Sequence, residues 1–229
     1  EEILDRGTLM KITQTSCHAQ RFNLKEPYTI AYETVDHCDN IFLRVETDSP
    51  WVGLGCAAPD KEITGETRES VMAAYHHVIE PVLRGASPFH YARIVEELKS
   101  KLASEPSALA MVDMALFDLV AKKAGLPLYQ MLGGYRDHIE TSITIGIMDL
   151  PRTLALALKW KKARFRSLKI KGGIDSESDI ERIICVREAI GQDISLRFDA
   201  NGGFTVEQAV QFIRRTQDSG IELFEQPTK

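Results

Sequence analysis

The spacing of hydrophobic and polar residues changes partway along the chain. Residues 8–58 contain segments rich in β-branched and aromatic residues, "TLMKITQTS", "YTIAYETV" and "NIFLRVETD", a composition typical of β-strands. "DSPWVGLG" then predicts a turn and a short further strand. Between residues 66 and 125 the apolar residues recur at helical spacing instead, in segments 66–85, 87–103 and 107–125. Strands followed by helices indicate an α+β unit.

From residue 139 onward, strand-like and helix-like segments alternate. Strands are expected at 139–147, 167–173, 194–200 and 221–227, with helices at 150–163, 176–190 and 205–220 between them. Repeated βα units of this size predict a parallel sheet, either open or closed as a barrel. The apolar stripes expected to be buried are Ile180, Ile183, Ile184 and Ile190 on the second of these helices, and Val206, Ala209, Val210 and Ile213 on the third.

Polar side chains lie near the carboxyl ends of all four expected strands. Parallel strands covered on both faces are normally almost wholly apolar, so these residues require an explanation. The intervals 144 to 169, 171 to 199 and 199 to 225 are 25, 28 and 26 residues, or one βα unit each. The carboxyl ends of barrel strands meet at one mouth, where active sites form. The residues are Thr144, Lys169, Lys171, Asp199, Asn201 and Glu225.

These charges are consistent with one metal-assisted reaction. Asp199 and Glu225 on neighbouring strands repel each other unless a cation lies between them, and carboxylate oxygens suit magnesium. A divalent cation and burial would lower the pKa of Lys169 and Lys171, which makes a neutral amine available as a base. An amine base facing a Lewis acid can remove a proton next to a carboxylate, because the metal stabilises the enolate that results.

Each residue also has a simpler explanation on its own. Asp199 could cap a helix or lie in a loop, Glu225 could be a solvated strand end, and a K-x-K pattern occurs on edge strands, where lysine discourages pairing. Their arrival at the same end of consecutive βα units favours a shared site.

Composition and charge exclude several classes of partner and location. The net charge of −5, with no basic run longer than "KWKKARFR", disfavours nucleic acid as a partner. No apolar stretch reaches the ~20 residues that a membrane span needs, and the acidic start of the chain lacks the apolar centre of a signal peptide. The four scattered cysteines are expected to be buried free thiols. A cytoplasmic protein is therefore expected.

Several motifs resemble those of the enolase superfamily, in its muconate-lactonizing-enzyme-like subgroup. They are "LRVETDSPWVGLGCAAP", "TGET", "VDMALFDLVAKKAGLPLYQMLGG", "LKIKGG", "LRFDANGGFT" and "FEQP", and they run through nearly the whole chain. The segment "TSITIGI" is most similar to that of the dipeptide epimerases. The resemblance implies an α+β capping domain in residues 1–130, followed by the first half of a (β/α) barrel in residues 131–229.

The resemblance also implies roles for individual residues. Lys171 resembles the family's proton-transferring lysine, and Lys169 resembles the neighbour that polarises the substrate. Asp199 and Glu225 resemble two ligands of magnesium, the implied cofactor. Asn201, in the matching "DAN", is expected to contact the metal-binding residues and not the metal itself. Thr144 resembles a threonine that contacts a bound dipeptide.

Two departures from the family pattern modify these expectations. Tyr32 and Glu33 stand where epimerases of glutamate-ending dipeptides carry an arginine, so a dipeptide with a cationic or apolar C-terminal residue is the expected substrate. Four barrel strands are present where the family has eight, and the third metal ligand and an opposing lysine are absent. The chain is therefore expected to be truncated, and we expect little turnover from these residues alone.

Two alternatives remain open. One is a relative that uses a single base, such as an o-succinylbenzoate synthase or a muconate cycloisomerase, with the same lysines and carboxylates. The other is a non-catalytic half-barrel that hides its open sheet edges by pairing with a second copy, as a homo-oligomer.

Overall fold

The computed structural model describes residues 10–229, which form two compact units. The first contains residues 10–23 and His37–Asp137, and the second contains Leu24–Asp36 and His138–Lys229. The structure divides the chain between Asp137 and His138. It also assigns a short segment from the first half of the sequence to the second unit.

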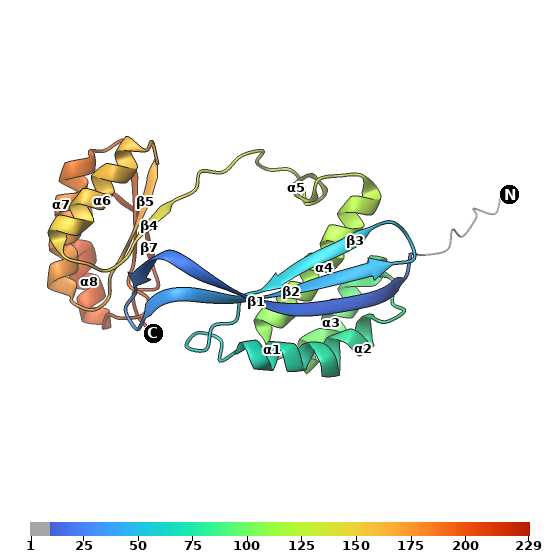
Figure 1. Cartoon of the computed structure of the whole chain (residues 1–229). Coiled ribbons are helices and arrows are strands. Elements are labelled where there is room, and N and C mark those ends of the chain that lie inside the picture. Colours follow the sequence, from blue (N-terminus) through green and yellow to red (C-terminus); the bar gives the residue numbers. More distant parts are fainter. Residues whose placement is uncertain (1–9) are drawn as a thin grey trace. The chain divides into compact units, whose positions relative to one another are not determined.

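The sheet of the first unit has three strands in the order β1-β2-β3: β1 (Ile12–Thr29), β2 (Thr34–Thr47) and β3 (Val52–Ala57) (Figure 1). The prediction of a separate strand at 28–35 was wrong. This segment contains the turn between β1 and β2, where the Ile30 N–H donates to the Glu33 carbonyl oxygen at 2.9 Å. Residues up to Thr29 continue β1 despite Pro27, because an edge strand tolerates a residue without an N–H donor.

Helices pack on this antiparallel sheet in the predicted order. They are α1 (Arg68–Ala74), a π-helical turn (Tyr75–Ile79), α2 (Glu80–Leu83), a 3₁₀ turn (Pro88–His90), α3 (Tyr91–Lys101), α4 (Pro106–Ala124) and the unpredicted α5 (Leu128–Met131). Gly53 and Gly55 let β3 approach α4 closely, since a Cβ on Gly55 would lie 1.9 Å from the Met111 carbonyl oxygen. The core joins Ile41, Leu43 and Val45 of β2 to α4 residues such as Leu116.

The second unit contains four parallel strands in the order β4-β5-β6-β7. The strands are β4 (Ile143–Ile145), β5 (Ser167–Lys171), β6 (Ser195–Asp199) and β7 (Ile221–Glu225). Three helices alternate with them, α6 (Leu150–Lys162), α7 (Ser176–Ile190) and α8 (Val206–Arg215), and a 3₁₀ turn (Gln217–Ser219) precedes β7. The helices cover one face of the sheet (Figure 1). A capping domain followed by four βα-type strands is the predicted architecture.

The buried stripe of α8 differs from the prediction. Ala209 and Phe212 are buried, whereas Val206, Val210 and Ile213 are 63%, 41% and 54% exposed. Phe212 stacks on Phe198 of β6 with ring centroids 4.4 Å apart, and its larger apolar area favours the rotation of α8 that buries it. The stripe of α7 was predicted correctly for Ile180, Ile183 and Ile190.

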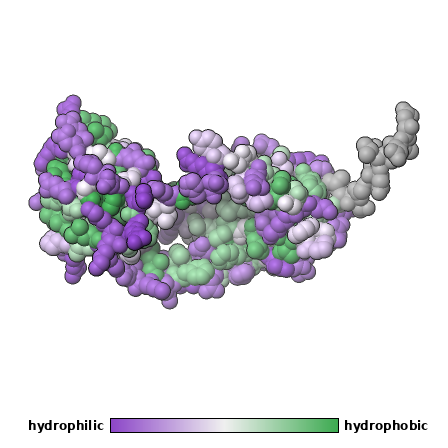
Figure 2. Space-filling view, turned by 90° about the horizontal axis from the view of Figure 1, so that it is seen from above, coloured by the Kyte–Doolittle hydropathy of each residue, from purple (hydrophilic) through white to green (hydrophobic). Residues whose placement is uncertain are grey.

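The surface combines polar and apolar residues. Figure 2 shows hydrophobic residues interspersed among hydrophilic ones on the visible face of both units. Across residues 10–229, none of the helices has both the length and the apolar character required to cross a membrane.

The cysteines offer a first test of this fold. All four are free, but the expectation that they are buried was wrong, since Cys38 is exposed and the other three are half-buried. Burial raises the pKa of the Cys17 thiol from 9.0 to about 11, so at neutral pH Cys17 holds roughly 100-fold less thiolate than an ordinary cysteine.

We therefore expect iodoacetamide to modify Cys38 well before Cys17, with the Cys17 rate still rising with pH up to about 11. Mass spectrometry of peptides after timed labelling measures both rates. In urea the two rates should converge, and equal rates in the folded protein would contradict the packing of Cys17 against the core.

Candidate active site

The strand ends of the second unit are aligned so that the predicted polar residues meet. Lys171, Asp199 and Glu225 are register partners across β5, β6 and β7. Two residues earlier along the strands, Thr144, Lys169 and Arg197 are partners across β4, β5 and β6. Their strand neighbours Leu168, Ile170, Leu196 and Phe198 are fully buried among the helices. Because side chains alternate along a strand, the polar set lies on the opposite face.

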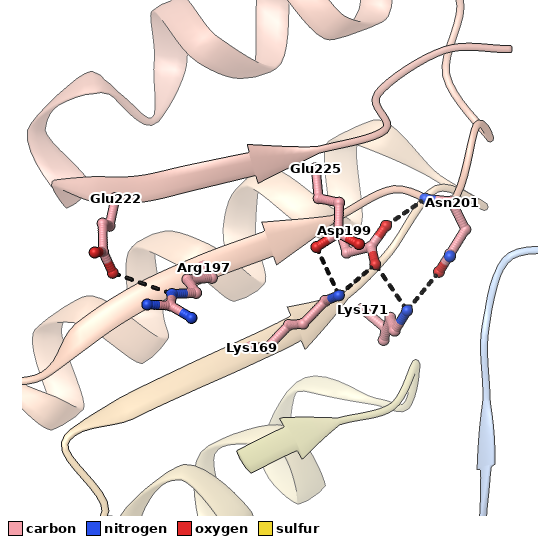
Figure 3. Close-up of polar contacts among 7 residues, drawn as sticks. All are labelled: Lys169, Lys171, Arg197, Asp199, Asn201, Glu222 and Glu225. Carbon is pink, nitrogen blue, oxygen red and sulfur yellow. Dashed lines mark hydrogen bonds and ion pairs between the residues drawn. The ribbon is translucent and has the colours of Figure 1, made fainter. Parts of the chain in front are cut away.

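The two lysines share one carboxylate oxygen, that of Asp199, at this edge of the sheet (Figure 3). Lys169 Nζ lies 2.8 Å from Asp199 Oδ2 and 2.7 Å from Glu225 Oε2. Lys171 Nζ donates to the same Asp199 oxygen at 2.8 Å and to Asn201 Oδ1 at 3.1 Å. Repulsion between neighbouring ammonium groups is thus offset by an aspartate whose side chain is 1% exposed.

The protonation of this group follows from its contacts. Burial alone would lower the pKa of Lys169, but its hydrogen bonds to Asp199 and Glu225 outweigh burial and raise that pKa. Burial alone would raise the pKa of Asp199, yet hydrogen bonds from Lys169 and Lys171 lower it. The expectation of a depressed lysine pKa assumed a bound dication. With the carboxylates free to pair with lysine, the shift of the Lys169 pKa is in the opposite direction.

The backbone after the aspartate and the glutamate adopts unusual angles. Asn201 has φ of 48° and Gln226 has φ of 38°, both in the left-handed region. In this conformation the Asn201 N–H donates to Asp199 Oδ1 at 2.9 Å while its side chain accepts from Lys171. Strained residues of this kind are maintained by surrounding contacts and concentrate at functional sites. The asparagine thus orients both the carboxylate and the amine.

Two carboxylates of this group, those of Asp199 and Glu225, are suitable ligands for a hard divalent cation. A single point, now the Lys169 nitrogen, lies within 2.8 Å of oxygens from both Asp199 and Glu225. The Lys169 ammonium occupies this point, so the two carboxylates would hold a cation there only when Lys169 no longer pairs with them. No three His, Cys, Asp or Glu side chains within residues 10–229 form a ready metal cluster. Asp199 and Glu225 would therefore hold magnesium together with waters or substrate oxygens.

The turn between β1 and β2 lies beside these strand ends, within the same unit. The Ile147 N–H donates to the Thr29 carbonyl oxygen at 2.8 Å, and Ala31 Cβ lies 3.2 Å from where a Cβ on Gly173 would stand. Tyr32 and Glu33 follow directly and are exposed. Thr144 is also exposed, on the same sheet face as Lys169. The three residues expected to contact substrate thus belong to the unit that carries the lysines.

One charged pair of this sheet face was missed from the sequence. Arg197 Nε donates to Glu222 Oε2 at 3.1 Å, and the Arg197 side chain points away from Asp199 (Figure 3). Arg197 precedes Asp199 by two residues, so the alternation of side chains along the strand already predicts that Arg197 lies on the same sheet face.

Comparison with known proteins agrees with the fold and with the motifs. Residues 12–133 match the mandelate racemase/muconate lactonizing enzyme N-terminal domain, and residues 152–229 match the enolase C-terminal domain-like family. The chain is 41% identical over 220 residues to an L-Lys-D/L-Arg epimerase of Desulforapulum autotrophicum, covering 96% of this chain and 62% of the relative. It is also 41% identical to the L-Ala-D/L-Glu epimerase of Bacillus subtilis, over 95% of this chain and 60% of that enzyme.

A solved structure shows the same similarity. The dipeptide epimerase of Enterococcus faecalis, crystallised with magnesium and L-Leu-L-Tyr, superimposes with a TM-score of 0.91 at 40% identity, over 96% of this chain and 62% of that chain. The present chain thus spans 60–62% of the length of these relatives. The family model alone matches more than half of the chain. The protein belongs to the mandelate racemase/muconate lactonizing enzyme family of the enolase superfamily.

Proposed function

We propose that the protein is a magnesium-dependent dipeptide epimerase, which removes and returns the proton on the carbon next to a carboxylate. The observation that carries this proposal is the contact of Lys169 and Lys171 with Asp199 and Glu225 at one sheet edge. An amine base lies there beside oxygens that suit a hard cation. Relatives at 41% identity that act on dipeptides support the reaction class.

The side chains would divide the work as follows. Lys171, held at its nitrogen by Asp199 and Asn201, accepts the α proton. Lys169 lies next to it and donates to the substrate carboxylate, which gains negative charge as the proton leaves. Asp199 and Glu225 hold magnesium, which when bound supplies positive charge against those same substrate oxygens. Thr144 of β4, the register partner of Lys169 on β5, orients the dipeptide.

The turn between β1 and β2 would set substrate preference. Glu33 is exposed there, two residues after Ala31, which lies beside Gly173 at the end of β5. A glutamate repels an acidic side chain and attracts a cationic one. We therefore extend the proposal to dipeptides whose C-terminal residue is cationic or apolar.

We also propose a cytoplasmic location, which the four cysteines without a disulfide favour.

The reaction is tested by following α-deuterium exchange and optical rotation separately in deuterated buffer with magnesium chloride. Protein with a complete barrel should exchange and invert a dipeptide, whereas residues 1–229 alone should give at most exchange without inversion. Lys171→Met in the complete protein should lower the rate by about 10²–10⁴, the usual contribution of a general base. Turnover of a cyclohexadiene substrate in place of any dipeptide would instead favour a one-base relative. Absence of exchange with every dipeptide would contradict the proposal.

The substrate preference needs its own comparison. We expect kcat/KM for dipeptides ending in arginine or leucine to exceed that for L-Ala-L-Glu, and Glu33→Gln to narrow the gap. Glu26→Gln changes the same charge on β1 and serves as the control. Faster epimerisation of L-Ala-L-Glu by the wild type would rule out the role of Glu33.

A further inference from the structure

The backbone directly after the Lys171 side chain, on either side of residue 172, is held by two side chains of α7. Lys171 is the last residue of β5, and β4 ends at Ile145 opposite Ile170, so the Lys171 carbonyl extends beyond its neighbouring strand. Arg182 Nη2 takes the place of a strand and donates to that carbonyl oxygen at 2.9 Å. Two residues later, the Gly173 N–H donates to Asp179 Oδ2 at 2.8 Å. Both polar groups at the end of β5 are thus satisfied from α7.

Asp179 and Arg182 also form an ion pair with each other, and each residue is 3% exposed. Burying two charges costs several kcal/mol per ion, and apolar residues of similar size often stabilise a fold as well or better. Arg182 Nη1 is buried without a hydrogen-bond partner among the described residues, which adds to that cost. Stability alone therefore gives little reason for an ion pair here. What the pair provides is two directed hydrogen bonds, one on each side of residue 172.

The backbone in this turn has little freedom to move. A Cβ on Gly172 would lie 2.6 Å from Asp179 Oδ2 and 2.3 Å from Phe198 Cζ, so the residue must be glycine and is packed on both sides. On the side of β6, the Gly172 N–H donates to the Asp199 carbonyl oxygen at 2.9 Å. Residues 171–173 are therefore held between α7 and the strand that carries Asp199.

We propose that Asp179 and Arg182 are positioning residues for Lys171. Their hydrogen bonds to this segment go to its backbone and not to the Lys171 ammonium group. They hold the carbonyl of Lys171 and the N–H of Gly173, and thereby fix where the lysine side chain begins. From that origin Lys171 Nζ reaches Asp199 Oδ2 and Asn201 Oδ1 together. This inference rests on the role proposed above for Lys171 as the base.

The test compares two substitutions of the same kind on the same helix. Arg182→Lys keeps the charge but removes the planar guanidinium that reaches both Asp179 and the Lys171 carbonyl. Arg187→Lys is the matched control, because Arg187 is also buried and donates to the carbonyls of Gly191 and Ile194, at the opposite end of α7. A structural effect alone would appear in both variants.

The readout is the side-chain ammonium signal of Lys171 in ¹H–¹⁵N spectra of protein labelled at lysine, assigned by its loss in Lys171→Met. We expect Arg182→Lys to shift this signal and to speed exchange of its protons with water about tenfold, as for the loss of one hydrogen bond to a charged group. Arg187→Lys should lower the urea midpoint but leave the Lys171 signal at its wild-type position.

Asp179→Asn provides a second measurement that preserves shape. Its amide oxygen can still accept from Gly173, so the Lys171 signal should shift in the same direction as in Arg182→Lys but by less. If Arg182→Lys does not fold, Asp179→Asn decides the question. A Lys171 signal that stays unmoved in a folded variant, or moves equally in Arg187→Lys, overturns the proposal. Because this signal needs no turnover, that failure is distinct from failure of wild-type protein to exchange an α proton, which would count against the proposed function.

Discussion

Gly173→Ala is expected to lower the free energy of unfolding of the second unit by about 4 kcal/mol. Gly173 has φ of 105°, a conformation that costs an L-residue ~1–3 kcal/mol. The new Cβ would also lie 2.0 Å from the Ala200 carbonyl oxygen and 2.9 Å from its carbon, so the loop after β6 must move, at a further ~1–3 kcal/mol. Gly173 follows Lys171 by two residues, and the displaced loop carries Asn201. The same change should therefore also weaken magnesium binding.

A matched glycine separates the two causes. Gly191 lies in the same unit and also has positive φ, 78°, but the nearest heavy atom to its added Cβ would be the flexible end of Lys161 at 4.0 Å. Gly191→Ala should therefore cost only the conformational part, about 1–3 kcal/mol, in urea denaturation. Equal losses of unfolding free energy in the two variants would show that the contact with Ala200 does not contribute to the cost of Gly173→Ala.

The candidate site was predictable because it depends on order and period alone. Once the alternation of Leu168, Lys169 and Ile170 identifies a strand, the lysines share one face. Once helices separate successive strands, all strands run parallel and their carboxyl ends share one edge. These two rules alone, without any knowledge of packing, predict that Asp199 and Glu225 lie beside the lysines. Their contacts with Lys169 agree with this.

Features that depend on tertiary contacts were not predictable in the same way. The segment from Gln20 to Pro27 is rich in polar residues of low β propensity, and it continues β1 because it pairs within a long hairpin. Helix α8 has two apolar stripes, and only the position of Phe198 decides that Phe212 faces inward. Asp179 and Arg182, three residues apart, have the spacing of a surface ion pair on any helix. Their burial depends on the end of β5 lying beside α7.

Lys169→Met should make the stability of the second unit depend on magnesium. Without metal, Asp199 and Glu225 lose the ammonium group that they share, and Asp199 is almost fully buried, so we expect a loss of about 3 kcal/mol. The pKa of Lys169 is raised in the folded protein, so its contribution to stability is complete below its unfolded pKa of ~10.4 and is lost as pH rises through the folded value. At pH 8 the full loss should be observed.

Magnesium should reverse this loss in the variant, because a cation between the two carboxylates no longer competes with Lys169. We expect the magnesium affinity, measured by isothermal titration, to rise at least about tenfold, and saturation at 100 times Kd to return ~2.7 kcal/mol in urea denaturation. Arg197→Met removes a positive charge from the neighbouring strand. Because Arg197 pairs with the half-exposed Glu222, it should cost under ~1 kcal/mol and leave magnesium affinity unchanged. If Lys169→Met binds magnesium no more tightly than the wild type, the metal does not occupy the point between Asp199 and Glu225 where the Lys169 nitrogen now lies.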